Sequence, residues 1–451
     1  MKQIQAVAIL VLLLALSGCG KRELILDGKR FGVREALPGV PVGPAGQPVE
    51  PGAKAEKDDA DRARPIDLPP AQRLADWPQQ GSNAQHRPAH AALAAQLSPA
   101  WSASIGQGDD GKHRITADPV VAGGRVFTLD SRARVMAHST AGESLWQADL
   151  TPPGEREDDA TGGGLAFGGG RLFVTTGFGA LVALDPATGR QLWVQETDAA
   201  VTGAPSYRDG LVYLVSRDNR AWAIDAGNGR IQWQLPGTPS ASGMVGGAAP
   251  ALTDRLAVFP FGASELVATL RKSGVRVWSA AIPGQRRGAV YAQVTDITGD
   301  PVAADGRIYV ATQSGRTAAL DAASGDRIWT AEEGAYSPVL PVDDSVFLVS
   351  DQARLMRLDA ATGDEIWSRD LPYFTRERPK RFKEIYAHYG PILAGGRLIV
   401  ASNDGLIRSF SPETGKTLGT VPVPGGASTD PVVAGGTLYL VTTQGKLMAF
   451  R

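Results

Sequence analysis

From about residue 97 to the C-terminus, short runs of alternating apolar and polar residues recur along the chain, separated by glycine-containing turns. Residues 307–311 are one such run, with every second side chain apolar. A period of two positions predicts half-buried β-strands. Asp-Gly and Gly-Gly pairs between the runs supply the positive φ angles that tight hairpins need. The pattern therefore predicts a mostly β protein built from antiparallel hairpins.

The runs are organised as a repeat of four strands. Residues 118–127 match residues 430–439, and residues 183–193 match residues 357–367. In the clearest units the third strand ends near Leu-Asp, a Thr-Gly turn follows, and the fourth strand carries a tryptophan. These tryptophans recur roughly every 40 to 50 residues, at Trp101, Trp146, Trp193, Trp233, Trp278, Trp329 and Trp367. A period of that size with four short strands is typical of a β-propeller.

Counting the units predicts the number of blades. Complete units lie at 117–150, 162–197, 203–236, 248–282, 299–333, 336–371 and 389–423, and an eighth, 429–451, stops after three strands. Residues 97–103, which contain Trp101, supply a fourth strand and so remove an exposed sheet edge. We predict an all-β, eight-bladed β-propeller of four-stranded antiparallel blades, closed by an N-terminal strand. Seven blades is the alternative if the unit at 389–423, which has Gly419 in place of tryptophan, or the composite unit is miscounted.

The N-terminus has the pattern of a secretory signal. Lys2 precedes an apolar run at residues 6–16, which is too short for an ordinary membrane-spanning helix. The following Leu-Ser-Gly-Cys resembles the lipobox of bacterial lipoproteins, which implies removal of residues 1–18 and acylation of Cys19 as a membrane anchor. Gly20 in place of an aspartate then favours the outer membrane, facing the periplasm. A plain signal peptide with an incidental cysteine is the alternative.

Residues 19–76 have the composition of a tether. A Pro/Gly-rich stretch at 39–46 and a charged run at 54–59 have no apolar period, so we expect flexibility there and a propeller at 77–451. With 46 basic and 47 acidic residues, the net charge of −1 gives no long-range electrostatic case for nucleic acid. The only cysteine, Cys19, excludes a disulfide scaffold and a cysteine metal cluster.

The repeats over residues 97–451 resemble the PQQ-dehydrogenase-like propeller repeat. Joined to the lipobox and the chain length, the pattern is similar to lipoprotein propellers of the outer-membrane β-barrel assembly machinery. That resemblance implies a non-catalytic scaffold that docks on periplasmic domains of the barrel subunit BamA and contacts other barrel-assembly subunits. It also implies unfolded outer-membrane proteins as clients. A structural envelope lipoprotein that bridges other periplasmic partners is an alternative.

The resemblance also points to partner-binding residues in two neighbouring inter-blade loops. By position, Ser242 and Met244 match leucines of the family's docking surface, and Val245 matches its arginine. Asp296 and Thr298 match two aspartates. Only Asp296 keeps the residue type, while Met244 keeps the apolar character. Ordinary surface loops are the alternative for these positions.

A PQQ-dependent dehydrogenase is the enzymatic alternative. In that family the quinone commonly stacks on a disulfide of adjacent cysteines, which a chain with one cysteine cannot form. His86 and His90 have the spacing of a metal-binding helix, but Pro88 between them breaks that geometry. The other histidines are isolated, and we expect them at surface or turn positions: His113, His138 and His388. The sequence therefore predicts no catalytic set, no metal site and no cofactor.

A basic segment between the sixth and seventh units stands apart from the repeat. It contains five cations within eight residues, namely Arg376, Arg378, Lys380, Arg381 and Lys383. An acidic partner surface or lipid headgroups could bind such a segment, and neighbouring aromatic residues would add contact area. A solvated loop that aids solubility is the alternative.

Overall fold

The computed structural model describes residues 63–240, 246–284, 286, 294, 296–376 and 383–451. The chain divides into two compact units, Met1–Lys57 and Asp58–Arg451, and all described residues belong to the second. The expected signal peptide, the lipid anchor at Cys19 and the tether up to Arg62 lie outside the described residues. Within the described part, no helix has the length and apolar character needed to cross a membrane.

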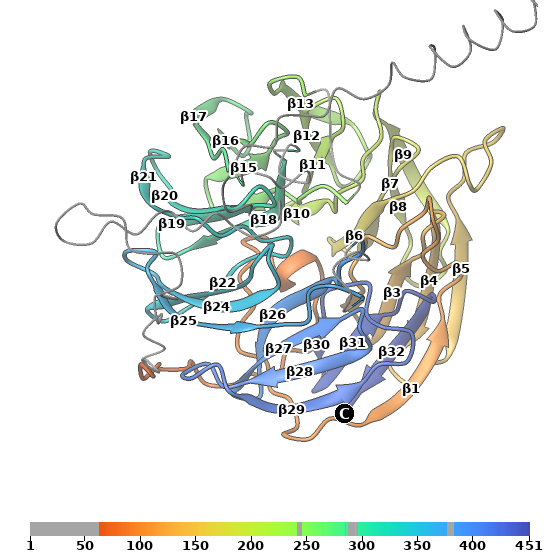
Figure 1. Cartoon of the computed structure of the whole chain (residues 1–451). Coiled ribbons are helices and arrows are strands. Elements are labelled where there is room, and N and C mark those ends of the chain that lie inside the picture. The colour runs from red at the N-terminus through yellow and green to blue at the C-terminus, as the bar shows by residue number, and fades with distance from the viewer. Residues whose placement is uncertain (1–62, 241–245, 285, 287–293, 295, 377–382) are drawn as a thin grey trace, which may run out of the picture. The chain divides into compact units, whose positions relative to one another are not determined.

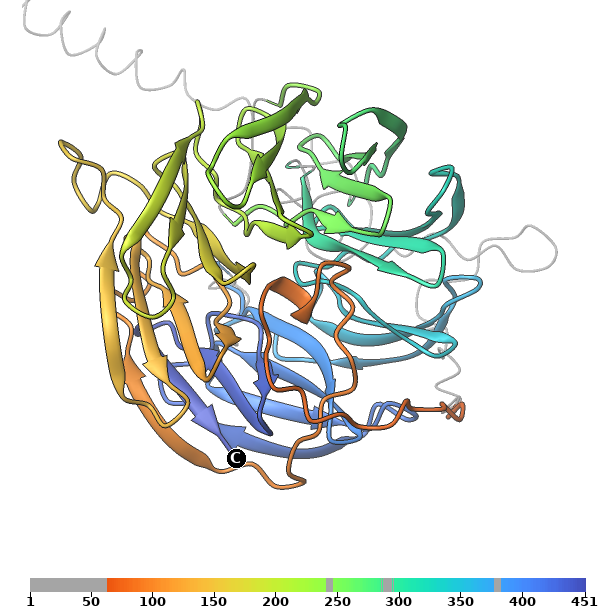
Figure 2. The same cartoon turned by 180° about the vertical axis from the view of Figure 1, so that it is seen from behind.

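The second unit is a ring of eight four-stranded antiparallel sheets, or blades (Figures 1 and 2). Four blades, each from the innermost to the outermost strand, are β2 (Val120–Ala122), β3 (Arg125–Leu129), β4 (Arg134–Ser139) and β5 (Ser144–Asp149); β6 (Gly163–Gly168), β7 (Arg171–Thr176), β8 (Ala180–Leu184) and β9 (Gln191–Glu196); β10 (Ser206–Arg208), β11 (Leu211–Ser216), β12 (Arg220–Asp225) and β13 (Ile231–Pro236); and β14 (Ala251–Leu252), β15 (Leu256–Pro260), β16 (Glu265–Leu270) and β17 (Arg276–Ala281).

The next three blades are β18 (Ile297–Ala304), β19 (Arg307–Thr312), β20 (Arg316–Asp321) and β21 (Arg327–Ala331); β22 (Leu340–Val342), β23 (Ser345–Val349), β24 (Arg354–Asp359) and β25 (Glu365–Asp370); and β26 (His388–Ala394), β27 (Arg397–Ser402), β28 (Leu406–Phe410) and β29 (Thr417–Pro422). The eighth blade contains β30 (Val432–Ala434), β31 (Thr437–Val441), β32 (Lys446–Phe450) and, as its outermost strand, β1 (Pro99–Ser104).

The eighth blade joins the two ends of the propeller. β1 pairs antiparallel with β32, with Ser102 opposite Met448. Beyond the strands, the amide of Ser98 donates to the carbonyl of Arg451 at 2.7 Å, and the amide of Arg451 donates back at 3.0 Å. The predicted eight-bladed ring with a composite last blade is therefore confirmed.

The tryptophan of each repeat connects its blade to the next one. The indole of Trp146 donates to the carbonyl of Pro186 in the following blade at 3.0 Å. The same ring covers Gly189, where an added Cβ would lie 2.4 Å from the indole. Gly189 has a φ of +72°, so it also adopts the left-handed backbone conformation that the turn needs. The other tryptophan–glycine pairs are Trp101–Gly142, Trp193–Gly229, Trp233–Gly274, Trp278–Gly325, Trp329–Gly363 and Trp367–Gly415.

The seventh blade lacks this tryptophan for a topological reason. Its outer strand β29 carries Gly419 at that position. The next blade is the composite one, in which β32 ends at Phe450 and β1 begins far away in sequence at Pro99. No turn connects its third and fourth strands, so it has no turn glycine against which an indole could pack.

An N-terminal strap, residues 63–98, runs along the innermost strands and includes a short 3-10 helix, η1 (Gln80–Ser82) (Figure 2). It exchanges backbone hydrogen bonds with several blades. Trp77 pairs with Val121 in β2, and the carbonyl of Gln85 accepts from the amide of Ala303 in β18 at 2.9 Å. Ala91 bonds to the end of β26. The strap therefore satisfies backbone groups on the inner edges of the blades.

The strap begins earlier than the expected start of the propeller at Trp77. Arg64 forms ion pairs with Asp344 and Asp359, and the fully buried guanidinium of Arg357 donates to the carbonyl of Arg64. Ile66 and Leu68 pack against the core between the sixth and seventh blades. The expected tether, 19–76, is thus wrong for residues 63–76. These residues are held by contacts with the blades, which a local apolar period does not reveal.

Candidate functional site

The connections that lead from one blade into the next open on one face of the ring. A cavity of about 410 Å³ lies among the first residues of the innermost strands on this face, and we call it the axial cavity. Gly246 and Gly247 border it, as do Thr298 and the residues Ile385–Tyr389. These residues flank the two expected docking loops and the basic segment. The structure therefore brings described residues next to all three sequence features to one cavity.

The residues expected in the docking loops have different surroundings. Ser242, Met244 and Val245 lie outside the described residues. Asp296 is partly buried directly before β18. Thr298 lies within β18 rather than in a loop, and its hydroxyl donates to the carbonyl of Ala335 in the neighbouring blade at 2.8 Å. This hydroxyl therefore already has an internal acceptor, while the residue borders the axial cavity.

The basic segment is described only at its ends. Arg376 and Lys383 are exposed there, whereas Arg378, Lys380 and Arg381 lie outside the described residues. The chain on either side is paired, because the amide of Thr375 donates to the carbonyl of Glu384 at 3.1 Å. An isolated bridge between Phe374 and Ile385 continues this pairing. The segment therefore starts and ends side by side at the border of the axial cavity.

Four carboxylates line the axial cavity, and we call the three that belong to innermost strands or lie just before them the axial carboxylates: Asp118, Asp300 and Asp430. Each directly precedes a proline: Asp118 and Asp430 lie just before β2 and β30, and Asp300 lies within β18. The amide of Asp430 donates to Asp118 Oδ1 at 2.8 Å, and the amide of Ala249 donates to Asp300 Oδ1 at 2.6 Å. Ser337 Oγ donates to Asp430 Oδ1 at 2.9 Å. Sequence reasoning missed this cluster, although the repeated Asp-Pro pair was a visible signal.

Burial dominates the electrostatics of the axial carboxylates. It raises the pKa of Asp300 to about 7, against the opposing hydrogen bonds from Ala249 and Gln80. Burial also raises the pKa of Asp118 well above its ordinary value, and the neighbouring charge of Asp430 adds to that effect. Among the described residues, no lysine or arginine is a partner that stabilises these three charges. The cavity floor is therefore acidic, and the described part of the chain provides no lysine or arginine that pairs with it.

The walls of the cavity are rich in aromatic residues. Four tyrosines line it: Tyr336, Tyr373, Tyr386 and Tyr389. Tyr336 is 37% exposed. His388 also lines the cavity, and burial lowers the pKa of this histidine, which bonds to Ser402 Oγ and the carbonyl of Pro372. Asp351, a further lining carboxylate, is already paired with Arg286 at 2.7 Å.

The isolated histidines are buried, so the expectation of surface positions for them was wrong. His113, His138 and His388 are all 8% exposed or less. His86 is fully buried under the strap, where its Nδ1 bonds to the carbonyl of Pro301 at 2.9 Å, and burial lowers its pKa to about 4. No three histidine, cysteine or acidic side chains in the described ranges are placed to hold a metal ion.

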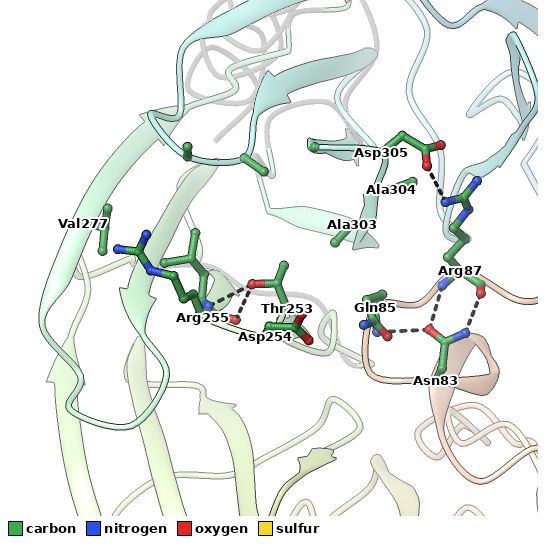
Figure 3. Close-up of a pocket in the computed structure, with 14 residues that line it drawn as sticks. Asn83, Gln85, Arg87, Thr253, Asp254, Arg255, Val277, Ala303, Ala304 and Asp305 are labelled. Atoms are coloured by element: carbon green, nitrogen blue, oxygen red, sulfur yellow. Dashed lines mark hydrogen bonds and ion pairs between the residues drawn. The ribbon is translucent and has the colours of Figure 1, made fainter.

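A second hollow of about 600 Å³ lies at the other ends of the strands, between the strap and the fourth and fifth blades (Figure 3). Arg87 of the strap reaches Asp305 at 2.8 Å, and Asn83 bonds to the backbone of Gln85 and Arg87. Asp254 on its rim pairs with Arg208. Because several of its charged groups are paired within the protein, this hollow offers less for ligand recognition than the axial cavity.

Eight four-stranded blades linked by a repeated tryptophan–glycine contact place the chain in the class of PQQ-type eight-bladed propellers. A family model described as "Outer membrane protein assembly factor BamB" matches residues 131–369 and 379–451. The chain therefore belongs to the BamB family.

Individual relatives agree with this assignment. The outer membrane protein assembly factor BamB of Yersinia pestis is 25% identical over 252 residues, which cover 54% of this chain. That match spans 64% of the Yersinia protein, less than two thirds of its length. The BamB of Shewanella oneidensis is 26% identical over 368 residues, covering 77% of this chain and 87% of the relative.

Solved structures show the same fold. BamB from Moraxella catarrhalis has a TM-score of 0.65 at 20% identity, covering 79% of this chain and all of that one. A quinohemoprotein alcohol dehydrogenase from Comamonas testosteroni has a TM-score of 0.64 at 17% identity, covering 87% of this chain and 83% of that one. At these identities the likeness shows the fold alone, which assembly factors and dehydrogenases share.

The axial cavity does not fit the quinone of such dehydrogenases. PQQ is itself a polyanion with three carboxylate groups, and here it would meet Asp118, Asp300 and Asp430. The described residues supply no cation that pairs with these charges. Burial raises the pKa of each of these carboxyls, so each is either an anion that repels the quinone or a neutral acid that cannot neutralise its charge. The lining is therefore unfavourable for an anionic quinone.

Proposed function

We propose that the protein is a non-catalytic scaffold of the outer-membrane β-barrel assembly machinery. In this proposal it docks on periplasmic domains of BamA and assists the assembly and insertion of outer-membrane proteins. Membership of the BamB family supports the role. The observation that supports the docking site is that described residues next to three inter-blade connections line one cavity. An acylated Cys19 would hold the propeller at the outer membrane, facing the periplasm.

The geometry near the cavity suits contact with another backbone. An added Cβ at Gly247 would meet its nearest atom, Thr202 Oγ1, only at 3.8 Å, so the absence of a side chain leaves space there. Gly246 has a φ of +82°, which a side chain would strain. Close approach of backbones is what strand addition by a partner requires. We therefore place the BamA contact at this side of the face, beside Asp296.

Client binding is proposed for a different surface, the outermost strands. These strands are sheet edges, which present unpaired backbone groups to an extended chain. They also carry exposed aliphatic side chains: Leu145, Leu192, Val194, Ile231, Val277, Ile328 and Leu418. Unfolded outer-membrane proteins alternate apolar and polar residues in strands. Such segments match these edges in both hydrogen bonding and apolar contact.

The basic segment is proposed as a secondary contact with lipid headgroups or assembly partners. Its exposed ends, Arg376 and Lys383, lie on either side of the paired stem. Replacing Arg376, Arg378, Lys380, Arg381 and Lys383 by serine should lower affinity for anionic vesicles or for the assembly complex. Unchanged affinity at both low and physiological salt would exclude this contact.

Affinity purification of the native lipoprotein in mild detergent tests the main proposal. We expect BamA among the bound proteins, and its loss after Asp296→Arg or Met244→Asp. Asp364→Arg is the matched control, because Asp364 is exposed in the turn between β24 and β25, away from the inter-blade connections. Recovery of BamA with both docking variants would support the proposed function and refute the proposed docking site. Recovery of another envelope complex without BamA would refute the function.

A further inference from the structure

We propose that the axial cavity binds the guanidinium or ammonium group of a basic side chain from the protein that docks on this face. The inference rests on the proposed function only in taking the occupant to be a docking protein. It adds a chemical specificity that neither the repeat nor the family match supplies. The charge, the shape and the position of the cavity each support it.

The charge argument comes from the axial carboxylates. Asp118, Asp300 and Asp430 approach the centre of the ring from the first, fifth and eighth blades. Their hydrogen bonds come from amides and from the side chains of Ser337 and Gln80, which are neutral donors. A buried carboxylate without a counter-ion is costly, and an opposite charge within hydrogen-bonding distance removes much of that cost. A cation entering the cavity would supply the missing charge.

The shape argument selects an organic cation on a stem. A volume of about 410 Å³ lies within the range of about 300–1,000 Å³ that is usual for ligand pockets. The tyrosine rings of Tyr336, Tyr373 and Tyr386 offer faces for an alkyl stem and for cation–π contact. No three potential ligands among the described residues are close enough together for a metal ion. The lining therefore suits a charged tip with an apolar stem rather than a compact metal ion.

The position argument favours a protein side chain over a free molecule. Residues flanking three inter-blade connections, including Gly246, Thr298 and Tyr386, border the cavity. A protein that docks on these connections would present a side chain directly to the cavity. A free diamine would lack the contacts that a docked protein makes outside the cavity, so we expect it to bind less tightly than a protein side chain.

The proposal predicts a linkage between binding and pH. Since burial raises the pKa of Asp300 to about 7, this carboxyl is partly protonated near neutral pH. A bound cation favours the ionised form, so binding releases protons and weakens as the pH falls. The other groups facing the floor do not reverse this sign. Burial lowers the pKa of His388 and raises that of Tyr389, so both shifts favour the neutral side chain. Asp351 is paired with Arg286, and Asp109 accepts a hydrogen bond from Ser428.

A peptide probe tests this inference without BamA. The probe is acetyl-Gly-Arg-Gly-amide, and the matched control replaces arginine with citrulline, which is neutral and almost identical in shape. Calorimetry or ligand-observed NMR on the full-length protein should detect saturable binding of the arginine peptide only. Asp300→Asn and Asp430→Asn should each weaken binding by about tenfold, since a charge-assisted contact is lost. Asp364→Asn should leave binding unchanged, and lowering the pH from 8 to 5.5 should weaken it.

Several results would overturn the inference. They are no saturable binding up to about 10 mM, equal binding of the citrulline peptide, or full binding by both asparagine variants. Tyr336→Leu at the exposed part of the wall is a second test, which should weaken binding severalfold even if an asparagine variant fails to fold. Tighter binding of putrescine than of the peptide would refute the choice of a protein side chain. BamA is absent from this assay. If the wild-type protein recovers no BamA from cells, the proposed function is therefore refuted while the arginine site stands.

Discussion

Replacing Gly363 by alanine should destabilise the propeller by removing the space that Trp329 occupies. Gly363 lies in the turn before β25, with a φ of +78°. An added Cβ would sit 2.5 Å from Cε3 of Trp329, a distance that real Cβ contacts do not reach. Trp329 is 6% exposed, and its Nε1 donates to the carbonyl of Ala360 at 2.9 Å. The indole must therefore move, and this hydrogen bond and the blade contact are disturbed together.

The size of the effect follows from two separable costs. Holding alanine at a left-handed φ costs about 1–2 kcal/mol, of which the stiffer unfolded chain offsets about 0.4–1 kcal/mol. Forcing a buried side chain aside costs about 1–3 kcal/mol, and a strained or broken hydrogen bond adds about 1 kcal/mol. We expect Gly363→Ala to cost about 2–4 kcal/mol more than an alanine at a turn glycine without a neighbour.

Gly306 supplies that comparison. It has nearly the same φ, +76°, but an added Cβ there would meet no atom within 4 Å. Urea unfolding followed by tryptophan fluorescence gives the free energy of unfolding for each variant. A Trp329→Leu background completes a double-mutant cycle, in which the extra cost at Gly363 should largely disappear. If Gly363→Ala costs no more than Gly306→Ala, the tryptophan–glycine contact is not what links the blades.

Three further predictions concern the buried ionisable groups and the strap. Asp300→Asn should stabilise the protein relative to wild type by about 4 kcal/mol at pH 8 and by under half of that at pH 5. The reason is that a pKa raised from 3.8 to about 7 costs wild-type stability as the pH rises through this window. An equal difference in stability between variant and wild type at both pH values, measured by thermal unfolding, would refute this. His86→Asn should reduce the loss of stability between pH 7 and pH 4 by about 3 kcal/mol. Burial lowers the histidine pKa to about 4, so protonation in this range favours the unfolded chain. A stability-versus-pH curve parallel to that of wild type would contradict it. Arg64→Met should speed hydrogen exchange of the backbone amides of residues 64–76. It should change global stability by less than about 1 kcal/mol, because its ion pairs with Asp344 and Asp359 are partly exposed. Unchanged exchange would show that these pairs do not hold the strap.

The propeller itself was predictable because its signals are local and repeated. Turn glycines mark the hairpins and tryptophans mark the outer strands of most blades, and the lone strand around Trp101 completes the unfinished eighth unit. The weak seventh outer strand was also visible, as Gly419. The sequence did not show why this strand lacks a tryptophan, because the reason is the missing turn between β32 and β1. That reason becomes clear only when the ring is closed.

The strap and the axial carboxylates were not predicted, for a different physical reason. Residues 63–76 have no period of their own, and contacts such as Arg64 with Asp359 join positions far apart in sequence. Asp118, Asp300 and Asp430 look like turn residues when each is considered alone. They become a cluster only because the innermost strands of different blades start around one axis. The pairwise long-range geometry that creates them is absent from local sequence patterns.

The central claim is that the face around the axial cavity is the docking surface for BamA, and site-specific cross-linking tests it most directly. Cys19 is the only natural cysteine, so a cysteine introduced at Asp296 or at Asp364 can carry a photoreactive probe in the acylated protein. Asp296 is two residues before Thr298, which borders the cavity, and Asp364 lies in the turn before β25. We predict an adduct with BamA from position 296 and none from position 364. An adduct from 364 without one from 296 would contradict the account.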